Sequence, residues 1–246
     1  HQEARRQRQM CIRDSPNRFN RITKKLQPFI LFIAVITLIS GLYFGLYDSP
    51  KDYQQGDAVR IMYVHVPSAW LATFLYFSLA ISCVFYLVWK HPLADLVSSS
   101  IAPIGTLFSA LTLITGSLWG KPMWGTWWVW DARLTSMLIL CIFYFAYIGI
   151  SNAFPRKIDG SKPAAILAIV GMVNLPIIKF SVDWWNTLHQ PASIIRFDGP
   201  SINQEMLLPL VIMLLGFLFM SIFIILINIK TNLIYKKYQS EILKLG

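Results

Sequence analysis

Residues 28–47 read PFILFIAVITLISGLYFGLY and contain no charged side chain. A stretch of about 20 apolar residues is long enough to cross the hydrocarbon core of a bilayer, which is roughly 30 Å thick. Lipid offers the backbone no hydrogen-bond partners, so a chain that crosses it must satisfy its own amides, as a helix does. This stretch therefore predicts a transmembrane helix and sets the class of fold.

Five more apolar runs follow the first, at residues 66–89, 97–118, 135–154, 163–182 and 206–228. The chain is 55% hydrophobic and only 14% charged, whereas a soluble domain carries about 25% charged residues. We therefore predict an all-α polytopic membrane protein with six transmembrane helices. Pro176 should kink the fifth helix, and Lys179 near its end should extend its ammonium group to the interface.

The basic residues predict the orientation of these helices. The formal net charge is +10, and about 16 of the 22 Lys and Arg lie in the N-terminal segment, the turns at 90–96 and 155–162, and the C-terminal tail. The positive-inside rule assigns that side to the cytoplasm. Both termini should then be cytoplasmic, and the outward loops should be residues 48–65, 119–134 and 183–205. Because topology accounts for the basic excess, we predict no nucleic-acid partner.

We expect the sequence to divide into three parts. Residues 1–21 form a basic leader that we expect to be partly non-native or disordered, residues 22–237 form the six-helix domain, and residues 238–246 form a cytoplasmic tail. The three cysteines form no CxxC pair, which argues against a disulfide framework. The common nucleotide-binding and hydrolase motifs are also missing from the sequence. We therefore do not expect an enzyme.

The middle outward loop, residues 119–135, reads WGKPMWGTWWVWDARLT. It holds five of the nine tryptophans, which are Trp119, Trp124, Trp127, Trp128 and Trp130. An aromatic belt at the membrane interface explains one or two per helix end. Closely spaced indoles instead make a broad apolar platform, and Gly120 and Gly125 would let a flat ligand approach the backbone. Asp131 is placed to cap the next helix, and Arg133 either reaches the interface or pairs with a ligand carboxylate.

Two histidines, His65 and His189, lie in the outward loops on either side of these tryptophans, whereas His1 and His91 lie on the cytoplasmic side. A lone histidine at an interface is usually structural, but a pair beside an aromatic platform favours a ligand site. Two imidazoles on opposite faces of a macrocycle would fill both axial positions of haem iron. A zinc site would lack further ligands. We therefore expect haem b, held non-covalently by His65 and His189.

The pattern Trp-Gly-x-Trp-Trp-x-Trp-Asp-Ala-Arg-Leu-Thr at residues 124–135 resembles the WWD signature of the haem-handling proteins of cytochrome c biogenesis. His65 and His189 match in position that family's two periplasmic histidines. The six expected helices resemble its small branch, the haem exporter protein C (CcmC) family. The resemblance covers residues 22–237.

This resemblance implies a protein of the bacterial inner membrane whose functional loops face the periplasm. It implies haem binding there and delivery of haem to the haem chaperone CcmE for c-type cytochrome maturation. The other implied partners are the ABC-type subunits CcmA and CcmB and a small single-pass subunit. Arg60 and Arg133 are the candidate partners of the haem propionates.

Two other functions stay open. A permease for haem or another small molecule would have polar or Gly/Pro-broken helices at mid-membrane depth, and Pro103 and Pro176 are the features of that kind. A haem-b anchor of a respiratory complex would place its histidines within packed helices. His65 and His189 are expected instead at a helix end and in a loop, which argues against an anchor.

Overall fold

The computed structural model describes residues 2–154, 157–190, 193–194 and 199–242. Its helices are α1 (Gln2–Tyr43), α2 (Met62–Trp89), α3 (Pro92–Trp124), α4 (Ala132–Asn152), α5 (Lys157–Gly171), α6 (Asn174–Trp184) and α7 (Gln204–Ile242). A π-helical turn (Phe44–Asp48) continues α1, and a 3-10 turn (Asp57–Ile61) leads into α2. Six segments are long and apolar enough to cross a membrane, with α5 and α6 together forming one of them. The predictions of an all-α protein and of six such helices are confirmed.

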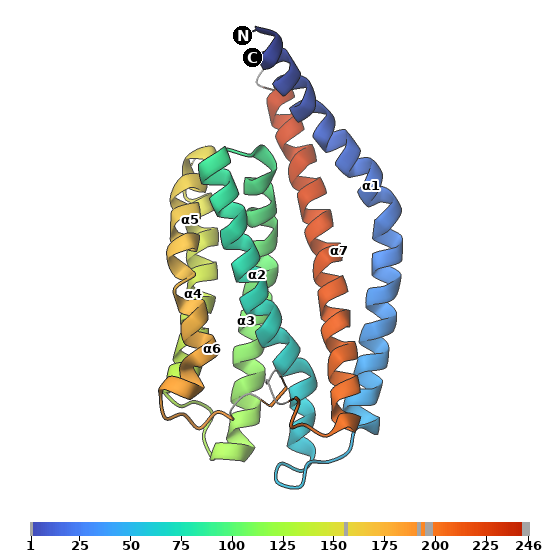
Figure 1. Ribbon diagram of the computed structural model, residues 1–246, viewed down its shortest axis with the longest axis vertical. Helices are drawn as coiled ribbons and strands as arrows, with labels where there is room; N and C mark the ends of the chain where they lie inside the picture. Colours follow the sequence, from blue (N-terminus) through green and yellow to red (C-terminus); the bar gives the residue numbers. More distant parts are fainter. Residues whose placement is uncertain (1, 155–156, 191–192, 195–198, 243–246) are drawn as a thin grey trace.

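Helices α2 to α6 form a bundle, and α1 and α7 pack against each other along its side (Figure 1). The contacts between this pair and the bundle are made chiefly by α7, which touches α2 and α3. The first turns of α1 and the last turns of α7 lie at one end of the molecule, as an even number of spans requires (Figure 1). The side of the membrane on which that end lies stays a prediction, as do the leader at 1–21 and the tail at 238–246.

Several helices reach beyond the apolar runs that predicted them, and two of these extensions bear on the outward loops. Helix α2 begins at Met62 rather than at residue 66, and α3 ends at Trp124 rather than at residue 118. Hydropathy marks only the part of a helix that lipid surrounds, whereas backbone hydrogen bonding continues past the interface. As a result, His65 belongs to α2, and the segment expected as a loop at residues 119–134 is helical up to Trp124.

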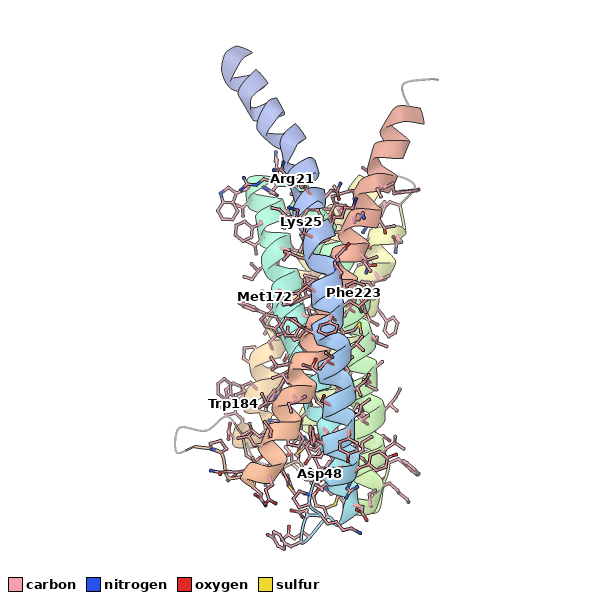
Figure 2. The ribbon with its side chains drawn as sticks, turned by 90° about the vertical axis from the view of Figure 1, so that its right-hand side faces the viewer. Arg21, Lys25, Asp48, Met172, Trp184 and Phe223 are labelled. Atoms are coloured by element: carbon pink, nitrogen blue, oxygen red, sulfur yellow. The ribbon has the colours of Figure 1, made fainter. Side chains whose placement is uncertain are left out.

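The fifth span is broken rather than kinked. Helix α5 ends at Gly171 and α6 starts at Asn174, and Figure 2 shows Met172 about half-way along the bundle. A proline ring clashes with the carbonyl four residues earlier, which for Pro176 is that of Met172. This carbonyl oxygen instead accepts a shorter-range bond from the Leu175 amide, at 3.0 Å. Pro103 has no such effect, because α3 runs through it without interruption.

Tyrosines deep in the bundle use their hydroxyls to join helices. The Tyr144 hydroxyl donates to the Ala72 carbonyl oxygen at 2.8 Å, and the Tyr147 hydroxyl donates to Ser98 Oγ at 2.9 Å. Both rings are buried. Gly105 on α3 makes room for one of them, because a Cβ there would overlap the Tyr144 ring. A small residue at a helix contact thus lets α3 and α4 approach closely.

We expect Gly105→Ala to destabilise the protein by about 1–3 kcal/mol, the usual cost of overpacking. Tyr144 cannot move aside without giving up its hydrogen bond to Ala72. Gly149→Ala on α4 is the matched control, since a Cβ there would meet nothing within 4 Å. Thermal unfolding in detergent should show a lower Tm for Gly105→Ala than for Gly149→Ala. Equal values would contradict this packing.

Candidate functional site

A cavity of about 340 Å³ lies between α2, α3, α4 and α6, at the end of the bundle away from the termini, where α2 begins and α3 ends (Figure 1). Its volume falls within the usual range for small-molecule and cofactor sites, about 300–1,000 Å³. Seven of the predicted site residues line it, namely His65, Trp119, Gly120, Trp124, Trp128, Arg133 and His189. Its walls are mainly apolar, with a few polar side chains among them.

His65 lies one turn into α2, with its ring against α3. Its Nδ1 is 3.1 Å from Thr115 Oγ1. The imidazole stands edge-on to the Trp119 indole, with ring centroids 5.7 Å apart. A Cβ added to Gly116 would be 3.0 Å from His65 Cε1, so the ring presses closely on the α3 backbone.

His189 lies in the segment after α6, on a wall of the same cavity. Its amide donates to Thr187 Oγ1 at 3.1 Å, and its Nδ1 is 3.0 Å from the Gln190 carbonyl oxygen. A carbonyl only accepts, so Nδ1 carries the proton and Nε2 keeps its lone pair. Burial lowers the pKa of His189, and the positive charge of Arg133 acts in the same direction. The ring is therefore held neutral, the form that binds metals.

The tryptophans divide into two groups. Trp119 and Trp124 lie on the last turns of α3, and Gly125 ends that helix with φ +75° while its amide donates to the Lys121 carbonyl oxygen at 3.0 Å. Gly125 therefore acts as a helix terminator and does not line the cavity. Gly120 gives room to an indole rather than directly to a ligand, because a Cβ there would be 3.0 Å from Trp124 Cε3.

The second group follows α3. Trp128 lines the cavity, and its indole N–H is buried without an acceptor among the described residues. Trp127 and Trp130 do not line it; their side chains are 54% and 76% exposed. Lys121 Nζ lies 5.7 Å from the Trp127 ring centroid, and Trp130 meets Trp128 edge to face. Of the five tryptophans at residues 119–130, three thus line the cavity and two lie at the surface, and Trp70 on α2 is a fourth lining tryptophan that the sequence analysis did not single out.

Asp131 caps α4, as the sequence predicted, since its Oδ1 accepts from the Leu134 amide at 2.8 Å. Arg133 joins α4 to α6: its Nε donates to Ser181 Oγ at 2.9 Å and its Nη2 to the Lys179 carbonyl oxygen at 3.3 Å. Arg133 is also among the residues that line the cavity.

Arg60 lies elsewhere. Its guanidinium donates to the carbonyl oxygens of Leu46 and Ser49 and lies near Asp57. These contacts hold the first outward loop together, and Arg60 is not among the residues that line the cavity. A sequence offers no way to separate such an arginine from one that faces a ligand.

Sequence reasoning missed two supporting residues. Gln55 Oε1 accepts from Trp119 Nε1 at 2.9 Å, which ties the first outward loop to the tryptophans. Thr115 contacts His65 and lies four residues, about one helical turn, before Trp119. That spacing is a signal the sequence carried. Within the described residues, no cluster of three or more His, Cys, Asp or Glu gathers as a metal-ion site.

Comparison with known proteins identifies the group to which this architecture belongs. Residues 10–244 match the family model CcmC, described as "Heme exporter protein C". The Heme exporter protein C of Bradyrhizobium diazoefficiens is 45% identical over 226 residues, 92% of this chain and 86% of the relative. That of Haemophilus influenzae is 49% identical over 214 residues, 87% of each chain.

A third relative comes from a plant. It is a Marchantia polymorpha protein named as a candidate ccmC-like mitochondrial protein of cytochrome c biosynthesis, 50% identical over 181 residues, 74% of this chain and 76% of its own length. The family model spans nearly the whole chain, and it includes every residue that lines the cavity. The chain with the tryptophan-lined cavity therefore belongs to the CcmC, or heme exporter protein C, family.

Proposed function

We propose that this protein binds haem b non-covalently in the cavity, with His65 and His189 as the axial ligands of the iron. The observation that carries the proposal is that both histidines, 124 positions apart in the sequence, line one cavity with Trp119, Trp124 and Trp128. The His189 ring is held neutral, as a metal ligand must be. Haem brings its iron as cargo, and ligation on both sides leaves it no open position for oxygen chemistry.

The other groups around the cavity suit a porphyrin. Indole faces match a flat, mostly apolar ring. The buried Trp128 N–H has no acceptor within the described part of the chain, and Arg133 lines the cavity. Both are donors for a propionate, and an arginine–carboxylate pair is among the stronger hydrogen-bonded contacts. Arg60 is left out of this set because it does not line the cavity.

We propose that the cavity faces the periplasm from the bacterial inner membrane, with both termini in the cytoplasm. The excess of Lys and Arg at the terminal end of the chain supports this orientation. The protein would deliver haem to the chaperone CcmE for c-type cytochrome maturation, with CcmA, CcmB and a small single-pass subunit as further partners. Membership of a haem exporter family, rather than of a family of enzymes, supports this role.

A second candidate function, transport of haem through the protein, has one observation in its favour. The cavity continues inward to Met137 and Leu175, and Leu175 lies beside the break between α5 and α6. Broken helices that line a binding site are common in transporters. Uptake of haem into sealed vesicles that contain only this protein would favour transport, and its absence would favour delivery from the outer face.

The ligand assignment predicts the spectrum of the purified protein. We expect a low-spin haem spectrum from the wild type in detergent. His65→Ala and His189→Ala should each lose haem or shift to a spectrum with one histidine ligand, because each removes one axial bond. His91→Ala is the control, since His91 is exposed at the start of α3, outside the cavity. Wild-type haem content and spectra in both single variants would overturn the assignment.

The role of Arg133 predicts a selective effect on the propionates. Arg133→Ala should weaken haem binding about 10- to 100-fold, because a hydrogen bond to a charged group contributes about 1.5–3 kcal/mol. The dimethyl ester of haem, which has no carboxylate, should bind the variant and the wild type nearly equally. Titrations of both ligands measure this. An equal loss for haem and its ester would show that Arg133 acts only by joining α4 to α6.

A further inference from the structure

We propose that Thr115 on α3 is a positioning residue that holds the His65 ring with its proton on Nδ1, which leaves Nε2 to bind iron. The proposal rests on the haem-binding function proposed above. It concerns a residue that contacts the histidine and does not itself bind the iron. Three features carry it: the hydrogen bonds of the Thr115 hydroxyl, the close fit of the His65 ring on α3, and the contrast with His189.

The hydrogen bonds of Thr115 decide which ring nitrogen is protonated. A threonine hydroxyl has a single hydrogen to donate. Thr115 Oγ1 lies 2.6 Å from the Leu111 carbonyl oxygen and 3.3 Å from that of Thr112, and both oxygens can only accept. The hydrogen is therefore directed to its own helix. Towards His65 Nδ1, at 3.1 Å, Thr115 Oγ1 acts as acceptor.

The neutral imidazole has one donor and one acceptor nitrogen. If Nδ1 donates to Thr115, then Nε2 keeps the lone pair. The nitrogen that does not bond to Thr115 is therefore the one that can bind iron. Metal-binding histidines commonly depend on such a bond from the second ring nitrogen, which fixes the orientation of the ring and raises its basicity.

Two other residues of α3 also lie close to the His65 ring. Gly116, next to Thr115, brings the helix backbone close to His65 Cε1. One turn later, Trp119 meets the imidazole edge to face. The indole N–H of Trp119 is fixed in turn by Gln55. Thr115 thus supplies the one side-chain hydrogen bond that the structure gives to a ring already confined sterically.

His189 also carries its proton on Nδ1, but a different kind of acceptor holds it there. Its Nδ1 donates to the carbonyl oxygen of Gln190, a main-chain atom that no side-chain substitution removes. The two axial ligands are therefore unequal. The side-chain hydrogen bond to His65 can be deleted by changing one hydroxyl, while the backbone contact of the ring with Thr112 stays. We expect that deletion to weaken the hold on one ligand and to leave the other unchanged.

The direct test compares Thr115→Val with Thr115→Ser. Valine keeps the shape of threonine but cannot accept, so Thr115→Val should bind haem about 10-fold more weakly, the lower end of the usual cost of losing such a partner. The haem midpoint potential should also rise, because a less basic imidazole stabilises ferric iron less. Thr115→Ser should restore both values. Thr106→Val is the control, since that hydroxyl bonds only its own helix and lies outside the cavity.

A second measurement remains decisive if Thr115→Val folds poorly. In a His65→Gly variant, added imidazole can ligate iron and donate its N–H to Thr115, whereas 1-methylimidazole can ligate but cannot donate. Imidazole should restore the low-spin spectrum at a severalfold lower concentration. Adding Thr115→Ser should keep this preference, and adding Thr115→Val should abolish it. Equal rescue by the two compounds with Thr115 present would overturn the proposal.

These outcomes also separate this proposal from the one before it. If His65→Ala retains the wild-type spectrum, His65 is not a ligand and the haem-binding arrangement itself fails. If His65→Ala loses that spectrum while Thr115→Val matches the wild type in haem affinity and potential, only the role of Thr115 fails.

Discussion

Lipid accepts and donates no hydrogen bonds, and this constraint shapes the whole protein. Polar side chains within the helices mostly bond to backbone carbonyls, as Thr106 and Ser221 do, or to a neighbouring helix, as Tyr144 and Tyr147 do. Asp131 closes the start of α4 in the same way. Against this background, polar atoms left free at the cavity are informative. Within the described residues, the buried N–H of Trp128 has no acceptor, and it lies at the same end of the bundle as the Nε2 atoms of His65 and His189, the proposed iron ligands.

The sequence allowed the spans and the candidate site to be predicted because both follow from local properties. Charge-free runs of membrane length predict helices. Because two spans separate each outward loop from the next, the loops of His65, Trp128 and His189 must lie at the same end. The cap by Asp131 was also readable, since it depends on residues three positions apart. That the two histidines share one cavity depends on how α6 packs on α4, which no local pattern records.

Other details depended on contacts between distant segments. The hydropathy of residues 119–124 is too mixed to show that α3 continues to Trp124, and the positive φ of Gly125 becomes meaningful only once that end is known. Arg60 and Arg133 are equivalent in the sequence, yet one binds the carbonyls of its own loop and the other joins two helices beside the cavity. Gln55 acquires its role only because its loop folds back on Trp119.

The break between α5 and α6 gives the two histidines of the cavity, the proposed iron ligands, unequal mechanical support. His65 is part of a helix of 28 residues and rests on α3. His189 follows a helix of only 11 residues, separated from the rest of its span and tied to α4 through Ser181 and Asn174. His65 is therefore held within a long helix that packs on α3, whereas His189 follows a short helix that is anchored separately. If the protein delivers haem as proposed, the bond from His189 to the iron would then have the lower barrier to opening.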